Sequence, residues 1–178
     1  MLGVVFTEFV ELVETAFSQD LADDVLDEAK TSTDGAFTAV GNYPFDDMVA
    51  LVTTLSAKTG VSVPDLLETF GQHLFGKLAE GHGELMDPSM TLFDMLASIH
   101  GHIHVEVKRL YPDAELPAFS VLSRTEDSMV LHYESSRRLE HLAKGLILGA
   151  AKQYDTAISV EMAEVDPTSV HITLTHAA

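Results

Sequence analysis

The spacing of apolar residues changes once along this chain, and that change restricts the fold more than any other feature. Up to about residue 111, apolar side chains recur at the i, i+3, i+4, i+7 spacing of one helix face. Beyond it, alternating apolar and polar residues indicate two β-hairpins, 118–134 and 158–175, with a helix over 139–150 between them. This order predicts an α+β fold with an N-terminal helical lobe, and a C-terminal lobe of a four-stranded antiparallel sheet and one helix.

Five helices are expected before the first hairpin. The fifth starts at Thr91, which forms a capping box with Asp94, and is expected to run unbroken to about Tyr111, where Pro112 stops it. The linkers contain nothing that demands two independent domains. We therefore expect a single domain over residues 1–178.

The charge balance excludes several classes of partner. Asp and Glu number 28 against 10 Lys and Arg, for a net charge of −18, which argues against nucleic acid and anionic lipid as ligands. A partner with a basic patch and a high-salt environment would both suit this acidity. The apolar start of the chain has no basic flank and carries periodic glutamates, so we expect neither a signal peptide nor membrane insertion, and a cytoplasmic location. The chain has no Cys, so any metal chemistry must use its nine His or its carboxylates.

Three histidines lie close together on the predicted fifth helix. At the angular step of an α-helix, His100 and His104 share a half-buried side one turn apart, while His102 faces solvent. Three interpretations stay open. The histidines are ordinary surface residues, or two of them bind a metal that still needs a third ligand, or one is the axial ligand of a flat apolar cofactor such as haem.

A second group of polar residues follows the second predicted strand. Alternate residues of an extended segment point the same way, so Tyr133, Ser135 and Arg137 can present two hydroxyls and a guanidinium to one acceptor. Such a set suits a carboxylate or a phosphate, and a helix N-terminus behind it adds partial positive charge. The alternative is that Ser135 or Ser136 caps the next helix and Arg137 pairs with a nearby acid.

Together, the two groups resemble the haem-nitric oxide/oxygen binding (H-NOX) family, the sensor domain related to the haem domain of soluble guanylate cyclase. The matching pieces are the start MLGVVF, the segment His104–Tyr111, Pro117 thirteen residues after His104, the Tyr133-x-Ser135-x-Arg137 triplet and the helix with Gly145-Leu146. The resemblance covers essentially the whole chain.

The resemblance implies a haem b (iron protoporphyrin IX) buried between a distal helical lobe, residues 1–60, and a haem-carrying lobe, residues 61–178. It implies that His104 is the axial iron ligand and that Pro117 presses on the macrocycle and distorts it. The implied propionate ligands are Tyr133, Ser135 and Arg137, and the implied pocket wall contains Val5, His100 and Leu146.

Oxygen-binding members of the family carry a distal tyrosine, helped by an asparagine and an aromatic residue. The matching positions are Leu142, Leu74 and Phe9, none of which donates a hydrogen bond. An apolar pocket disfavours O₂ and leaves NO and CO as ligands. His73 and His141 are the polar residues that could still enter the pocket.

The function implied is therefore a haem-based sensor of NO and CO, and not an enzyme. NO binding would weaken the bond from iron to His104, let the distorted haem relax and shift the helical lobe against the sheet. The signal would pass to a separate partner, a histidine kinase or a cyclic-di-GMP enzyme. One rival is a haem-free acidic protein-interaction module. A metal-dependent enzyme using His100 and His104 is the other, weakened by the lack of a base–nucleophile pair.

Overall fold

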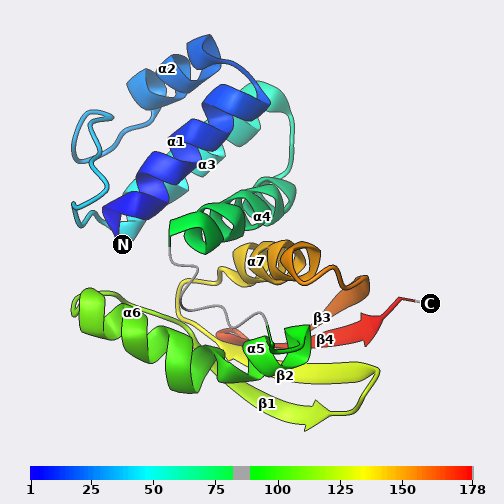
Figure 1. The fold of residues 1–178 in the computed structure, drawn as a ribbon. Helices are drawn as coiled ribbons and strands as arrows, with labels where there is room; N and C mark the ends of the chain where they lie inside the picture. The colour runs from blue at the N-terminus through cyan, green and yellow to red at the C-terminus, as the bar shows by residue number, and fades with distance from the viewer. Residues whose placement is uncertain (82–88, 178) are drawn as a thin grey trace.

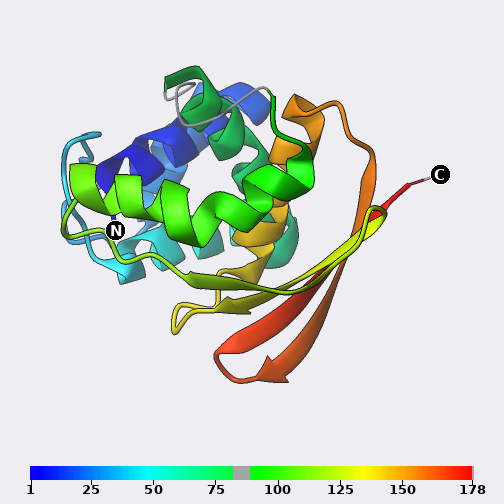
Figure 2. The same cartoon turned by 60° about the horizontal axis from the view of Figure 1, so that its bottom comes forward.

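The computed structural model describes residues 1–81 and 89–177, and it confirms the α+β architecture. Figures 1 and 2 show a layer of helices on one side of the molecule, a twisted sheet on the other, and α7 between them. None of the helices in these ranges is long and apolar enough to cross a membrane. The helices that precede the sheet are α1 Gly3–Ala16, α2 Gln19–Glu28, α3 Phe45–Thr59, α4 Val63–Gly81, α5 Leu92–Ser98, the π-helical segment η2 Ile99–Ile103 and α6 His104–Leu110.

The sheet consists of the two predicted hairpins, joined through their inner strands. The strands are β1 Ala118–Arg124, β2 Ser128–Glu134, β3 Ile158–Asp166 and β4 Ser169–His176, and α7 Glu140–Gln153 connects the hairpins. Their order is β1-β2-β4-β3, and every pairing is antiparallel. In the register of the central pair, Leu131 lies opposite Ile172, and both side chains are buried. The two central strands therefore supply the apolar face on which the helices pack.

Two groups of buried apolar side chains form the core. The first fills the space among α1, α2, α3 and α4, and the second lies between the sheet and the helices α5 and α7. Helix α4 belongs to both, because Leu74 is buried in the first group and Phe75 in the second. Leu146 of α7 packs against both groups. The central helices α4 and α7 thus connect the helical layer to the sheet.

Helices α4 and α7 cross at a contact between glycines. A Cβ atom added to Gly145 would overlap the backbone carbonyl of Glu68, and one added to Gly71 would overlap the carbonyl of Leu142. Backbones can approach this closely only where no side chain intervenes. The crossing therefore depends on these two glycines, and it fixes the position of Leu142 relative to α4.

The prediction of one regular α-helix from Thr91 to about Tyr111 is wrong in its middle part. Its start is as expected, because Thr91 and Asp94 exchange both hydrogen bonds of a capping box. Over Ile99–Ile103, however, the chain widens into a π-helical turn in which the His104 N–H donates to the carbonyl of Ile99. The additional residue in this turn changes the direction of every later side chain, so a wheel drawn at the α-helical angle fails here. His100 is consequently exposed and does not lie on the half-buried side expected for it.

Candidate functional site

His104 is the first residue of α6, and its side chain is half-buried against the sheet. Its Nδ1 atom is shielded from solvent, and the ring lies close enough to the backbone of Pro117 for the carbonyl there to act as a hydrogen-bond acceptor. Burial lowers the pKa of His104, the nearby charge of His100 lowers it further, and the backbone carbonyl of Pro117 acts in the opposite direction. The imidazole is therefore held in its neutral form, which is the form that ligates a metal ion.

Aromatic rings link His104 to the sheet. The His104 ring lies 5.9 Å from the ring of Phe119 on β1, and Phe119 lies 5.2 Å from the ring of Tyr133 on β2. Tyr133 is 2% exposed. Burial raises the pKa of its hydroxyl, while the Ser135 hydroxyl and the backbone of Leu139 lower it. Tyr133 is therefore a neutral hydroxyl at the end of β2, on the same side of the sheet as His104.

Arg137 lies in the turn that follows β2, close to the N-terminal end of α3. Its guanidinium stands 5.4 Å above the ring of Phe45, the first residue of α3, and forms an ion pair with the carboxylate of Glu115. Burial is the main cause that lowers the pKa of the Met1 amino group, and the positive charge of Arg137 lowers it further. The Ser135 hydroxyl accepts a hydrogen bond of 3.2 Å from the Arg137 backbone N–H. The guanidinium thus already binds a carboxylate, and that carboxylate belongs to a mostly exposed side chain.

The structure decides between some of the alternatives left open by the sequence. Helix α7 begins only at Glu140, and its N-cap Leu139 makes no side-chain capping bond within the described chain, so neither Ser135 nor Ser136 caps it. The other alternative, that Arg137 pairs with a nearby acid, agrees with its ion pair with Glu115. Among described residues, the group of three convergent metal-ligating atoms lies elsewhere and does not include His104.

The three apolar residues expected on the distal side lie together in the first core group. Their exposed fractions are 1% for Phe9, 5% for Leu74 and 9% for Leu142. Val5 and Leu146 are half-buried and pack against the same group. This cluster joins α1, α4 and α7, and its side chains offer no hydrogen-bond donor.

The remaining candidate residues are His73, His141 and Pro117. His73 of α4 points toward α1, where its Nε2 atom lies 3.4 Å from a carboxylate oxygen of Glu8. His141 is half-buried on α7, next to Leu142. Pro117 is half-buried immediately before β1.

Three residues of this region escape prediction from sequence. Phe119 lies between His104 and Tyr133, Glu115 pairs with Arg137, and Phe45 supports the guanidinium. Phe119 and Phe45 look like ordinary apolar positions of a strand and a helix. Glu115 is one of 28 acidic residues, so no local signal distinguishes it.

Haem iron in proteins is commonly held by a histidine, and His104 offers a half-buried imidazole in an α+β domain. Residues 2–162 match the haem-NO-binding family (HNOB). The chain belongs to this family, also called H-NOX, whose members are haem-binding gas sensors that signal to effector partners.

Individual relatives agree with this assignment. The Fe(II) unliganded H-NOX protein from K. algicida is 34% identical, with a TM-score of 0.95 over 100% of this chain and 97% of that one. The H-NOX from Shewanella woodyi, bound to IWP-051 in the Fe(II)CO ligation state, is 35% identical, with a TM-score of 0.84 over 99% and 95%. Soluble guanylate cyclase gcy-35 of Caenorhabditis elegans is 26% identical over 172 residues, which cover 92% of this chain. The chain spans about a quarter of that protein, 25% of its length.

Proposed function

We propose that this domain binds haem b through His104 and senses NO and CO, with O₂ excluded. The observation that carries the proposal is the His104 side chain, which is half-buried beside the sheet and is kept neutral because burial lowers its pKa. Bound haem would supply an iron centre for a diatomic gas. Because its imidazole is neutral, His104 would donate a ring-nitrogen lone pair to the iron without first losing a proton.

The acidic edge of the cofactor would bind at the other end of this region. Arg137 already holds the carboxylate of Glu115, so its guanidinium is oriented to bind a carboxylate. Glu115 is mostly exposed, which makes it easy to displace by a propionate. Tyr133 and Ser135 would complete the hydrogen bonds of that group, and Pro117 would press on the macrocycle. His100 would lie at the exposed edge of the pocket, next to Val5 and Leu146 in its wall.

Discrimination among gases follows from the apolar distal cluster. Iron-bound O₂ is polar and needs a hydrogen-bond donor for stability, whereas NO and CO need little such help. Phe9, Leu74 and Leu142 offer no donor, and His73 is turned toward Glu8 on α1. The pocket therefore favours NO and CO.

The response would use the two lobes of the molecule, residues 1–60 on the distal side and 61–178 on the haem-carrying side. A change in the bond to His104 would move α6 and shift the helical layer against the sheet. The output would pass to a separate protein, a histidine kinase or a cyclic-di-GMP enzyme in the cytoplasm, while this domain itself catalyses no reaction.

An absorption spectrum of the purified ferrous protein tests the haem site. We expect a Soret band in the wild type, its loss in His104→Gly, and its return when imidazole is supplied. The matched control, His102→Gly, alters an exposed histidine two residues away and should keep the band. A colourless wild type that takes up no hemin would reject the proposal and support a haem-free acidic interaction module instead.

Gas selectivity has its own test. The wild type should form stable ferrous complexes with NO and CO but none with O₂. Leu142→Tyr adds a donor to the distal cluster and should yield a stable oxy complex, whereas Leu142→Phe adds only bulk and should not. A stable oxy spectrum of the wild type would contradict the exclusion of O₂.

A further inference from the structure

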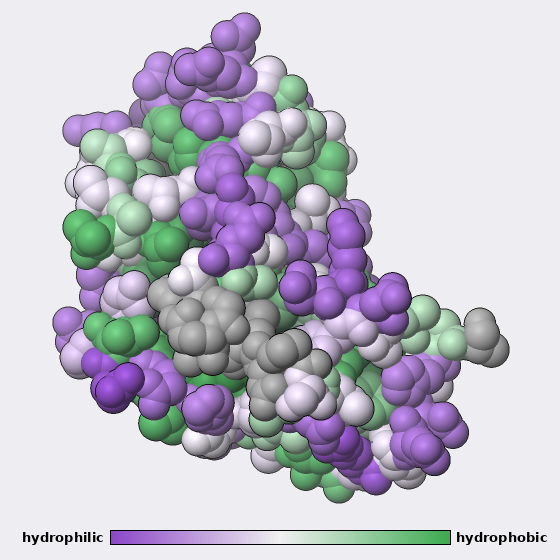
Figure 3. Space-filling view, viewed as in Figure 1, coloured by the Kyte–Doolittle hydropathy of each residue, from purple (hydrophilic) through white to green (hydrophobic). Residues whose placement is uncertain are grey.

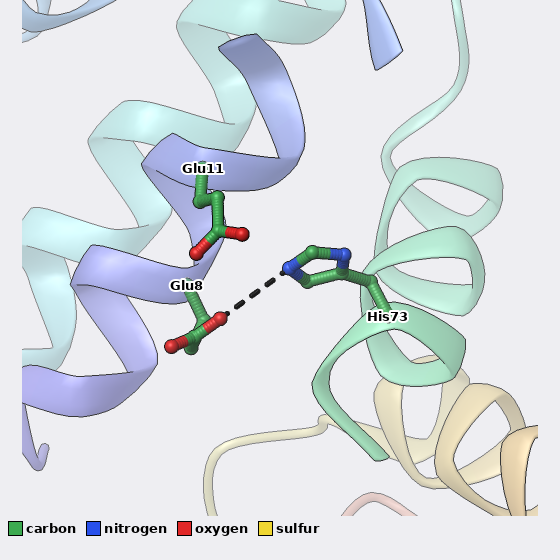
Figure 4. A group of neighbouring side chains, drawn as sticks. All are labelled: Glu8, Glu11 and His73. Atoms are coloured by element: carbon green, nitrogen blue, oxygen red, sulfur yellow. Dashed lines mark ion pairs between the residues drawn. The ribbon is translucent and has the colours of Figure 1, made fainter. Parts of the chain in front are cut away.

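A second set of ligand side chains lies where α1 packs against α4. Figure 4 shows Glu8 and Glu11, one turn apart on α1, pointing toward His73 on α4. One ligand atom of each residue lies within 4.8 Å of the other two. Figure 3 shows a hydrophilic band on the surface that crosses α1 toward α4. Three metal-ligating groups therefore converge from two separate helices.

Two atoms of this cluster have no hydrogen bond to satisfy them. The Oε2 atom of Glu8 and the Nε2 atom of His73 are both shielded from solvent and make no hydrogen bond within the described structure, although they lie 3.4 Å apart as an ion pair. Their side chains are only 18% and 17% exposed. A buried polar atom without a partner costs free energy, and a cation between these two atoms would satisfy both at once.

The separation of these atoms matches the geometry of a metal site. Zinc lies about 2.0–2.1 Å from histidine nitrogen and carboxylate oxygen, so two ligands of a tetrahedral ion are about 3.3–3.4 Å apart. The Nε2 atom of His73 and the Oε2 atom of Glu8 are 3.4 Å apart. The separation of these two atoms therefore suits two ligands of one ion, and Glu11 would complete the set by turning away from Lys77.

Glu11 is free to make that movement. Its side chain is 41% exposed and forms an ion pair of 2.5 Å with Lys77, which is itself 34% exposed. A divalent ion would replace the Lys77 ammonium, which is long, flexible and able to turn to solvent. Lys77 thus competes with a metal ion for the carboxylate of Glu11.

The helices that carry these ligands are held firmly in place. One residue from Glu8, the ring of Phe9 packs edge-on against Phe70 at a centroid distance of 5.3 Å, and Phe70 lies one turn before His73. The ligand backbones are therefore preorganised by a buried aromatic contact, and a net charge of −18 favours cations in general.

We infer that Glu8, Glu11 and His73 form a binding site for a first-row divalent cation that joins α1 to α4. An imidazole and two carboxylates suit Zn²⁺ or a neighbouring transition metal, with a water molecule as the fourth ligand. The site is separate from the proposed haem site and does not depend on haem binding. By joining two helices of the first core group, the ion stabilises the folded chain.

Calorimetric titration of Zn²⁺ into the protein of residues 1–178 tests this inference. The wild type should bind one ion at its tightest site. Glu8→Gln and His73→Gln should each weaken that site more than about tenfold, since even the outer partners of metal ligands cost about 10- to 100-fold when removed. Glu14→Gln, on an exposed residue one turn beyond Glu11, is the matched control and should bind as the wild type does. Zn²⁺ should raise the Tm of the wild type and of Glu14→Gln by more than it raises the Tm of Glu8→Gln or His73→Gln.

Lys77→Gln provides a result that a simple Glu–His ion pair does not predict. Removing the competing ammonium should tighten Zn²⁺ binding, whereas Lys144→Gln, which removes the partner of Glu68, should leave it unchanged. Absence of Zn²⁺ binding in the wild type, or wild-type affinity in His73→Gln, would overturn the inference. Neither result touches the haem proposal, which is decided by the absorption spectrum of the same protein.

Discussion

Helix α3 and the segment η2–α6 carry similar apolar patterns in the sequence, but their side chains are buried to different depths in the structure. Five residues of α3 are buried, among them Leu51 at 0% exposure. In η2 and α6, all of whose residues the structure describes, no residue is buried, and Leu110 is 53% exposed. Apolar periodicity therefore predicts that a segment is helical, but it does not predict how deeply the helix is buried.

The difference has a consequence for function. Segments with few buried side chains open and shift at lower free-energy cost than the core does. His104 lies in such a segment, at the junction of the π-helical turn and α6, while Phe9, Leu74 and Leu142 lie in the deeply buried core. The proposed iron ligand is thus on the more easily displaced side, and the distal cluster is on the rigid side.

The largest expected effect comes from truncating the same residue type in the two regions. Leu51→Ala removes a fully buried side chain and should lower the free energy of unfolding by about 2–5 kcal/mol. Leu110→Ala removes a half-exposed side chain and should change it by less than about 0.5 kcal/mol. Urea unfolding followed by far-UV circular dichroism measures both. Equal losses would show that α6 is held as firmly as α3.

A smaller effect is expected from two glycines of the central helices. Gly145→Ala forces a Cβ into the α4–α7 crossing and should cost about 1–3 kcal/mol. Gly76→Ala lies in α4, where nothing is within 4 Å of the added Cβ, so the better helix propensity of alanine should stabilise the protein by about 0.5–1 kcal/mol. The same urea titration compares them. Stabilisation by Gly145→Ala would contradict the close crossing.

The smallest effect concerns the capping box at the start of α5, the helix that leads into the η2–α6 segment. Hydrogen bonds from Thr91, followed by the bond and charge of Arg124, lower the pKa of Asp94 to about 2 from its usual 3.8. The folded state therefore favours ionised Asp94, and its contribution to stability is present above pH 3.8 and is lost as the pH falls toward 2. Asp94→Asn should lower the Tm at neutral pH and reduce its fall between pH 4 and 2, relative to the wild type. Parallel Tm curves for the two proteins would contradict this role.

The sequence predicts those parts of the fold that depend on local rules. Both hairpins are confirmed by β1–β2 and β3–β4, because alternation of apolar residues around a polar turn is a local signal. The capping box at Thr91 is confirmed for the same reason. The π-helical turn at Ile99–Ile103 is missed, since no residue type demands it, and the predicted placement of His100 fails with it.

In the candidate site, too, the sequence indicates some features and misses others. The residue types and spacing of His104, Tyr133, Ser135 and Arg137 left several interpretations open, and only the resemblance to the family favoured a haem site. The contacts of these residues were not predictable, because Phe119, Glu115 and Phe45 reach them from segments that are distant in sequence or locally unremarkable.

The sequence alone determined the fold class, the order of helices and hairpins, the acidity of the chain and the family to which it belongs, since each follows from composition, periodicity or motif. Only the tertiary structure decided that β2 pairs with β4, that α4 and α7 meet at Gly71 and Gly145, and that Glu8 and Glu11 face His73. These contacts join residues far apart along the chain, and they form because burying apolar surface brings the segments together, which no local pattern records.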